Sequence, residues 1–358
     1  MITVTKSFLP DIEEYFALIR KVWESGHLTN HGPLVNELEE KIKDYLGVKY
    51  FYYVNNGTIA LQIAIKALGL SGEVITTPFS YVATTSCLVW ESCTPVFADI
   101  DPETLTIDPA KIEAAITPRT TAILATHVYG IPCDVARIEE IAKRHNLRVI
   151  YDAAHAFGVT INNSSVLNYG DISTLSFHAT KLFHTVEGGG IATNDRELAR
   201  RISYMRNFGH NGPEDFFGVG INGKSSEFHA AMGLCLLPHL GQVLAKRKLL
   251  SEKYETLLKE ENVNISRPKI GDEVAYNYSY FPILFESEAE MLTVKNRLAA
   301  YNIHTRRYFY PSLNTLNYVA PQSCPVSEDV STRVLCLPLY PDLTEQEVSR
   351  IVRKIAFE

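Results

Sequence analysis

The sequence has few cysteines, no surplus of basic residues and no long apolar run. Its six cysteines form no CxxC pair, which argues against disulfides or a metal site and favours buried free thiols. The formal charge of −7 argues against a nucleic-acid-binding surface. No apolar run approaches the roughly 20 residues of a membrane span, and residues 1–10 lack the apolar core of a signal peptide. We therefore expect a soluble, cytoplasmic protein with no metal and no membrane partner.

The first half of the chain alternates between two kinds of apolar pattern. Short β-branched or aromatic segments predict strands at 50–54, 73–76, 95–99, 121–126 and 147–151, and amphipathic segments predict helices at 35–46, 59–68, 81–90, 110–116 and 135–145. This alternation predicts an α/β fold with a mainly parallel sheet that is covered on both faces. Ligands of such sheets bind beyond the carboxyl ends of the strands.

The pattern changes from about residue 251. We predict helices at 251–260, 291–300 and 344–354 and strands at 276–281 and 334–337. These elements indicate a smaller C-terminal α+β domain, which the long helical region 227–258 would join to the first. We place the large domain at residues 1–240 and the small domain at residues 241–358.

Lys181 is the first candidate for chemistry. It follows a predicted strand and the segment Ser176-Phe177-His178-Ala179-Thr180, and it precedes the run Gly188-Gly189-Gly190. A lysine in a pocket that lowers its pKa forms Schiff bases, and glycines allow a ligand to approach the backbone closely. The alternative is a surface lysine in a loop.

Asp152, at the end of the predicted strand 147–151, suggests a partner for such a lysine. A buried carboxylate here could keep the pyridine nitrogen of pyridoxal 5'-phosphate (PLP) protonated, which makes PLP a better electron sink. His155, about one turn further on, could hydrogen-bond the phenolic oxygen of the same cofactor. The alternatives are a helix cap for Asp152 and a satisfied, partly buried histidine for His155.

PLP also needs a phosphate site and a surface for its ring. Gly57 and Thr58 stand at a predicted helix start, where free backbone amides, a hydroxyl and the helix dipole favour an anion. Ser176 could add a second hydroxyl, and Tyr81 could lie against the ring. The alternatives are an ordinary Asn-Gly turn for Gly57 and a core aromatic for Tyr81.

With these residues in place, the chain resembles the DegT/DnrJ family of nucleotide-sugar aminotransferases along nearly its whole length. The resemblance is carried by residues 28–33, 55–61, 77–84, 152–156, 176–181, 187–189, 220–227, 310–311 and 337–341. It implies an aspartate-aminotransferase-like fold (PLP fold type I) and PLP as the cofactor. It also implies that Lys181 forms the Schiff base and moves the proton.

The resemblance assigns the other site residues in the same way. Asp152 would pair with the pyridine nitrogen, His155 would contact the phenolic oxygen, Tyr81 would stack on the ring, and Gly57, Thr58 and Ser176 would hold the phosphate. Asn222 would reach the phosphate of a neighbouring subunit, which implies a homodimer with shared active sites. The residues around Asn222 depart from the family pattern, since no Met precedes Ser226-Glu227 and no Leu-Gln follows it.

The resemblance implies L-glutamate as amino donor and a nucleotide-linked keto sugar as acceptor. Segments 72–78, 129–134 and 151–158 are similar to those of enzymes that aminate dTDP-4-keto-6-deoxyglucose at C4. The product, dTDP-4-amino-4,6-dideoxyglucose, is a precursor of bacterial surface polysaccharide such as O-antigen. Contacts with sugar or nucleotide are expected from Thr29, His184, Tyr308 and Tyr310, for which ordinary loop or core packing is the alternative.

Three other functions stay open. Amination at C3 of a dTDP-3-keto-6-deoxyhexose is the nearest alternative. A PLP-dependent lyase or dehydratase is less favoured, because dehydrating relatives carry histidine where this chain has Lys181. A PLP-binding regulator would normally carry a DNA-binding domain, and the acidic charge argues against one.

Overall fold

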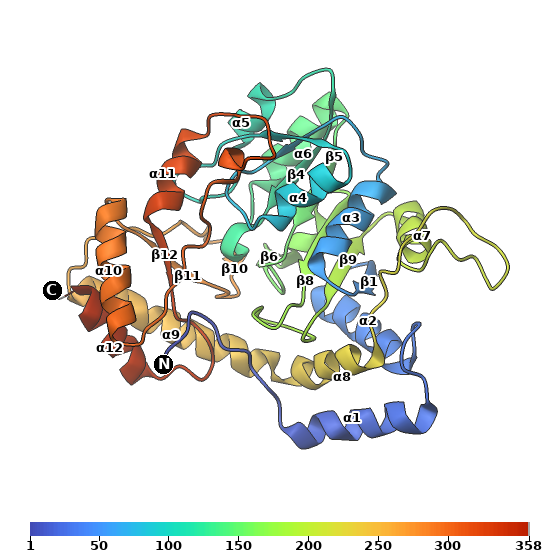
Figure 1. The fold of residues 1–358 in the computed structure, drawn as a ribbon, viewed down its shortest axis with the longest axis horizontal. Coiled ribbons are helices and arrows are strands. Elements are labelled where there is room, and N and C mark those ends of the chain that lie inside the picture. The colour runs from blue at the N-terminus through green and yellow to red at the C-terminus, as the bar shows by residue number, and fades with distance from the viewer. Residues whose placement is uncertain (357–358) are drawn as a thin grey trace.

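A seven-stranded sheet forms the centre of the larger region in the computed structural model, which describes residues 1–356 (Figure 1). Its strands, in spatial order, are β1 (Tyr50–Val54), β9 (Gly189–Thr193), β8 (Ile172–Ser176), β5 (Arg148–Asp152), β4 (Thr120–Thr126), β2 (Glu73–Thr76) and β3 (Thr94–Phe97). Neighbouring strands are parallel except where β9 pairs with β1 and β8. The predicted mainly parallel α/β sheet is confirmed.

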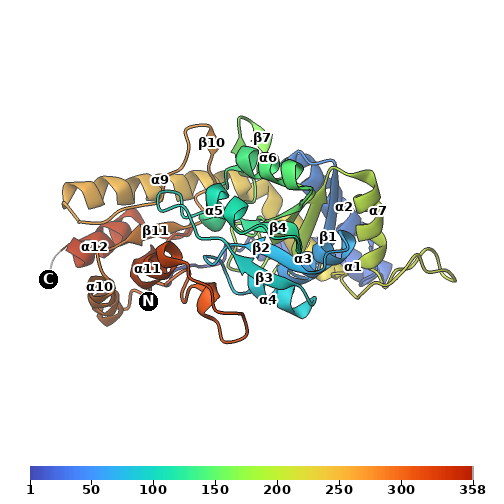
Figure 2. The same cartoon turned by 90° about the horizontal axis from the view of Figure 1, so that it is seen from above.

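Helices cover both faces of this sheet (Figure 2). The helices of the larger region are α1 (Ile12–Ser25), α2 (Pro33–Leu46), α3 (Gly57–Ala67), α4 (Ala83–Trp90), α5 (Pro109–Ala114), α6 (Val135–His145), α7 (Arg196–Met205) and α8 (Glu227–Leu236). Residues of α3, α4 and α7 share one apolar cluster with the sheet, and residues of α5 and α6 share another. The five predicted helices of this region all form, with ends shifted by a few residues at most.

The smaller region, orange and red in Figure 1, packs against the C-terminal half of α9 (Leu240–Glu260). Its antiparallel pair is β11 (Phe281–Leu284) and β12 (Val334–Leu337), and its helices are α10 (Glu288–Ala300), α11 (Pro325–Arg333) and α12 (Glu345–Ala356). The two strands, α10 and α12 share an apolar cluster with α9, and Val330 of α11 belongs to a separate cluster. The domain boundary at residue 240 stays a prediction.

The predicted strand at 276–281 is wrong for residues 276–280. That stretch has no regular structure and lies between β10 (Val274–Ala275) and β11. Strand β10 belongs to a small sheet with β6 (Thr160–Ile161) and β7 (Ser164–Ser165). Tyr278 has a φ of 52°, which an extended strand cannot contain. Asn277 bonds to backbone carbonyls of His155 and Phe157 in the larger region instead of to a neighbouring strand.

One helical run in the described part of the chain, Glu227–Glu260, is long and apolar enough by composition to cross a membrane. It consists of α8 and α9 with a short 3-10 turn containing Pro238 between them. Its Leu234, Leu240 and Val243 belong to the apolar cluster that α2 and the sheet also build. The run is therefore a core element of the fold, and its apolar residues serve packing. The six cysteines are buried free thiols, as predicted.

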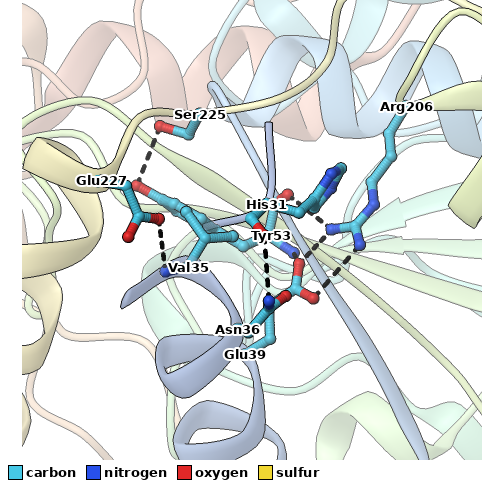
Figure 3. A network of polar contacts seen from close by, with 8 residues as sticks. All are labelled: His31, Val35, Asn36, Glu39, Tyr53, Arg206, Ser225 and Glu227. Carbon is cyan, nitrogen blue, oxygen red and sulfur yellow. Dashed lines mark hydrogen bonds and ion pairs between the residues drawn. The ribbon is translucent and has the colours of Figure 1, made fainter. Parts of the chain in front are cut away.

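A buried polar network joins the start of α2, the end of β1 and the segment after α7 (Figure 3). The Glu227 carboxylate accepts hydrogen bonds from the backbone amides of Leu34 (2.7 Å) and Val35 (3.0 Å). These amides begin α2, and Pro33 and Gly32 supply no capping side chain. A residue from α8 therefore caps a helix that lies far away in the sequence.

The same network holds β1 through an ion pair. Arg206 pairs with Glu39 and donates to the carbonyl oxygen of Tyr53 at 3.1 Å. Glu39 in turn accepts from the backbone amide of Tyr53 at 2.7 Å, and the Tyr53 and Ser225 hydroxyls are 3.3 Å apart. Since Tyr53 lies just before Asn56 and Gly57 in the sequence, the network sets where the chain enters α3.

The cap from Glu227 gives a test of this network. Glu227→Ala leaves two buried amides at the start of α2 without an acceptor, so we expect the free energy of unfolding to fall by about 2–3 kcal/mol. Glu37→Ala on the same helix removes an exposed pair with Lys41 and should cost no more than about 0.5 kcal/mol. Urea unfolding followed by tryptophan fluorescence measures both. Equal losses in the two variants would contradict the assignment of Glu227 as the cap.

Candidate active site

The predicted site residues gather where β4, β5 and β8 end. Asp152 closes β5, opposite Thr126 of β4 and Thr174 of β8, and Ser176 closes β8. A cavity beside these strand ends is lined by residues that include His155, Ser176, Lys181, Ser279 and Tyr280. The structure thus brings together the residues expected to carry the chemistry, at the edge of the sheet where ligands of parallel sheets bind.

Asp152 is a buried carboxylate with few partners. It is 6% exposed and accepts hydrogen bonds from the Thr84 hydroxyl (2.8 Å) and from the backbone amide of Ala154 (3.1 Å). Burial raises the pKa of Asp152, whereas these two bonds and the charge of Lys181 oppose that rise. Turns and not a helix follow Asp152, so it caps no helix. A cationic group in the cavity would find a counter-charge here.

Lys181 lies in a tight turn after β8. Its backbone amide donates to the carbonyl oxygen of His178 at 2.8 Å, and the Ser7 hydroxyl holds the neighbouring carbonyl of Ala179 at 2.6 Å. Burial lowers the pKa of Lys181, and the charges of Asp152, Tyr308 and Tyr81 oppose that change. The amine is therefore neutral, and so nucleophilic, over a wider pH range than that of a solvated lysine. A free surface lysine is not what the structure shows.

His155 is buried and neutral, and its tautomer can be assigned from its neighbours. Burial and the charge of Lys181 hold the pKa of His155 well below its usual value. The backbone amide of Tyr129 donates to Nδ1 at 3.2 Å, so the proton must be on Nε2. The ring lies parallel to that of Phe309, with centroids 5.5 Å apart. His155 can therefore donate one hydrogen bond to an oxygen acceptor.

Gly57 and Ser176 form a narrow cradle at the start of α3. A Cβ atom on Gly57 would lie 2.9 Å from the Cβ of Ser176, so only glycine fits here without displacing β8. Asn56 caps the helix by accepting from the amide of Ile59 at 2.8 Å. The remaining amides at a helix start have no partner within the helix. Together with the hydroxyls of Thr58 and Ser176 they fit an anion such as phosphate.

Tyr81 and Asn222 lie on the surface of the chain. Tyr81 is 59% exposed just before α4, so the alternative of a core aromatic is wrong. Asn222 is exposed, and its carbonyl oxygen accepts from the Asn55 side chain at 3.2 Å, close to the cradle. The ring contact of Tyr81 and the subunit contact of Asn222 stay predictions.

The four residues expected to touch sugar or nucleotide are less uniform. Thr29 and Tyr310 are exposed, and the Arg307 guanidinium lies over the Tyr310 ring at 3.6 Å. Tyr308 packs edge-on against Tyr280, with centroids 5.6 Å apart. His184 is buried, and both ring nitrogens bond to backbone groups, those of Phe8 (2.8 Å) and Val186 (3.3 Å). In this arrangement His184 has no ring nitrogen left for a substrate, and a substrate role for the four stays a prediction.

Sequence reasoning missed two parts of the site. Thr126, Ser80 and Thr84 form a buried chain of hydroxyls that ends on Asp152, with Ser80 3.1 Å from Thr126 and 2.8 Å from Thr84. The hydroxyl-rich segment after β2 was the available signal. Tyr280, whose hydroxyl is 3.5 Å from the Lys181 amine, was read as one residue of a strand. Its segment carried no signal for a site.

Comparison with known proteins places these features in a family. The model of the DegT/DnrJ/EryC1/StrS aminotransferase family matches residues 10–356. A dTDP-4-amino-4,6-dideoxy-D-glucose transaminase from Shigella dysenteriae is 45% identical, over 99% of this chain and 98% of that protein. A transaminase of the same name from Escherichia coli is 41% identical, over 98% of this chain and 97% of that protein.

Solved structures agree over the same length. The structure of DesI in the presence of its TDP-sugar product has a TM-score of 0.94 and 32% identity, over 99% of this chain and 92% of that one. The structure of NtdA from Bacillus subtilis with bound cofactor PMP has a TM-score of 0.88 and 30% identity, over 96% of this chain and 82% of that one. The predicted aspartate-aminotransferase-like architecture is confirmed.

The ionisation of Lys181 can be tested without any ligand. Its rate of reaction with an amine reagent, followed by mass spectrometry of the Lys181 peptide, should rise with pH through a midpoint below 10.5, because burial lowers its pKa. Asp152→Asn removes a charge that favours the ammonium form, so this midpoint should move to still lower pH. Asp329→Asn, which removes an exposed charge on α11, should leave it unchanged. A midpoint that rises in Asp152→Asn would contradict this electrostatic coupling.

Proposed function

This chain belongs to the DegT/DnrJ/EryC1/StrS aminotransferase family, and from that membership we propose that it transfers the amino group of L-glutamate to C4 of dTDP-4-keto-6-deoxy-D-glucose. The products are dTDP-4-amino-4,6-dideoxyglucose and 2-oxoglutarate, the former for surface polysaccharide such as O-antigen. The enzyme is a PLP-dependent aminotransferase. The near full-length match to two transaminases of that amino sugar carries the choice of substrate.

The residues of the candidate site fit PLP in charge and hydrogen bonding. When bound, PLP supplies the carbonyl carbon that takes up an amino group and a pyridinium ring that withdraws electrons from it. Asp152 would hold the ring nitrogen protonated, since its buried carboxylate lacks a full counter-charge. The Nε2 proton of His155 would reach the phenolic oxygen. Gly57, Thr58 and Ser176 would hold the phosphate, and Tyr81 would lie against the ring.

Lys181 would carry out two tasks in turn. Its amine would hold PLP covalently before the donor arrives and would be released when glutamate takes its place. The free amine would then move the proton from the α-carbon of glutamate to the cofactor carbon and, in the second half of the cycle, move a proton from that carbon to C4 of the sugar. Its burial beside Asp152 supports this role, because a lowered pKa lets one amine both accept and return a proton at a lower pH than a solvated lysine would.

The sugar nucleotide would lie at the exposed mouth of the site. Thr29, Tyr308 and Tyr310 are placed for such contacts by their exposed or half-buried side chains. His184 would support the turn that carries Lys181, through its bond to Phe8, and any contact with substrate would require that bond to open. Six free thiols suit a reducing compartment, and we place the reaction in the cytoplasm.

A donor and acceptor panel tests the reaction. The protein loaded with PLP should convert dTDP-4-keto-6-deoxyglucose and glutamate to the amino sugar and an equal amount of 2-oxoglutarate, both measured by mass spectrometry. Lys181→Ala should lose the visible absorption of lysine-bound PLP and at least about 1,000-fold in rate, because it removes both the covalent anchor and the proton carrier.

The alternatives have distinct signatures in the same panel. Higher kcat/KM with a dTDP-3-keto-6-deoxyhexose would move the reaction to C3. A sugar product formed without an amino donor would replace transfer by lyase or dehydratase chemistry. UDP- and GDP-linked 4-keto sugars serve as controls for the nucleotide.

We further propose that the functional unit is a homodimer whose subunits share their active sites. The loop between α7 and α8 projects from the body in both views (Figure 1, Figure 2). It exposes apolar side chains, with Phe216 59% and Val219 90% exposed. Exposed apolar clusters on a projecting loop favour a protein partner. Asn222 lies at the base of this loop, from which it would reach the phosphate site of the second subunit.

The loop can be tested independently of the chemistry. Val219→Asp combined with Phe216→Ser should weaken the dimer at least about 10-fold, because burying a charge without a partner is costly. PLP should then dissociate faster. Tyr301→Ser, at another exposed aromatic at the end of α10, should change neither property. Analytical ultracentrifugation over a concentration series gives the dissociation constant of the dimer. A monomeric wild type with firmly bound PLP would refute the shared site.

A further inference from the structure

The segment Asn277–Tyr280 reaches from the smaller region into the candidate site. The Asn277 amide donates to the carbonyl oxygens of His155 (2.9 Å) and Phe157 (3.0 Å), and the Ser279 hydroxyl donates to the carbonyl of His155 (2.9 Å). Asn277 is 2% exposed. It packs so closely on Gly130 that a Cβ there would lie 2.7 Å from its Oδ1. The segment is therefore fastened to the backbone that follows Asp152.

This attachment places the Tyr280 side chain next to both His155 and Lys181. The ring meets His155 edge-on with centroids 4.9 Å apart, and it also contacts Tyr129 and Tyr308. With these neighbours around the ring, the hydroxyl is directed at Lys181, whose Nζ donates to it at 3.5 Å. Both residues line the same cavity.

We propose that Tyr280 is a further catalytic residue, whose hydroxyl holds the Lys181 amine in place while that amine is not bonded to the cofactor. Asn277 and Ser279 are positioning residues, because their hydrogen bonds to the larger region hold Tyr280 in the lining of the cavity. The inference rests on the proposed role of Lys181 and adds a partner to it.

The need for such a partner follows from the chemistry of lysine. Once displaced, Lys181 has four rotatable side-chain bonds and the large rotamer entropy of a lysine, so its amine can leave the line of proton transfer. A hydroxyl acceptor at the released position restricts it. Burial raises the pKa of Tyr280, so the phenol neither gains nor loses a proton. The proton taken from the donor carbon would stay on Nζ until Lys181 delivers it to the cofactor carbon.

Tyr280→Phe removes the hydroxyl and keeps the ring, and Tyr276→Phe is its matched control. Tyr276 is a half-buried phenol of the same segment, but its hydroxyl donates to the backbone carbonyls of Tyr129 at 2.9 Å and of Tyr280 at 3.4 Å. In the apoenzyme, the midpoint of Lys181 labelling should move to lower pH by roughly one unit in Tyr280→Phe, because the ammonium form loses an acceptor. It should not move in Tyr276→Phe.

The loaded enzyme gives a second readout. In Tyr280→Phe, the single-turnover rate with glutamate should fall roughly 10-fold and the isotope effect with 2-deuterated glutamate should increase, because proton transfer becomes slower. Bound PLP and the melting temperature should match the control. A loss of structure alone would not raise the isotope effect.

Two outcomes would overturn the inference. One is a Tyr280→Phe variant with unchanged labelling midpoint and isotope effect, and the other is an equal change in Tyr276→Phe. If Tyr280→Phe folds poorly, Ser279→Ala keeps the phenol but loosens it, and it should show smaller changes in the same direction; no change there also refutes the inference. A wild type that releases no 2-oxoglutarate would instead reject the proposed function.

Discussion

The site depends on keeping one carboxylate, Asp152, buried. Removing a charge from water costs several kcal/mol, and only well-placed partners offset that cost. Thr84 and the amide of Ala154 supply two hydrogen bonds, and the charge of Lys181 supplies an opposite sign. Each partner comes from a different segment, so the ends of β5 and β8 and the start of α4 must meet at one point. The hydroxyl chain through Ser80 and Thr126 fixes that meeting point further.

The residues around this carboxylate are held by irregular backbone. The turn after Asp152 receives bonds from Asn277 and Ser279 of the smaller region, and the turn that carries Lys181 is held by Ser7 and Phe8 near the N-terminus. Rigid strands supply the frame, and loops fastened to it supply the chemistry. Both regions of the chain are therefore needed to complete one cavity.

Much of this could be predicted from the order of the residues. Local periodicity determined the alternating strands and helices, because strands such as β2 and β4 are buried along nearly their whole length and helices such as α2 bury one face. Asp152, Ser176 and Lys181 could be identified because they lie at or just beyond the carboxyl ends of strands, which is the ligand edge of a parallel sheet. Gly57 could be identified because a glycine at a helix start lets an anion approach the free backbone amides.

Only the tertiary structure decided which side chains complete the site. Aromatic and polar residues alternate over 276–280 as they do in a strand. The segment is nevertheless irregular, because Asn277 donates to backbone carbonyls more than a hundred positions away in the sequence. The same holds for Glu227, which caps α2, and for Tyr280, which meets Lys181. Such bonds cannot be predicted from the local sequence pattern, since the hydrogen-bonding capacity of a side chain is the same whatever partner it meets. The sequence by itself therefore determined the sheet, the lysine and the carboxylate, and folding determined the residues that hold them in position.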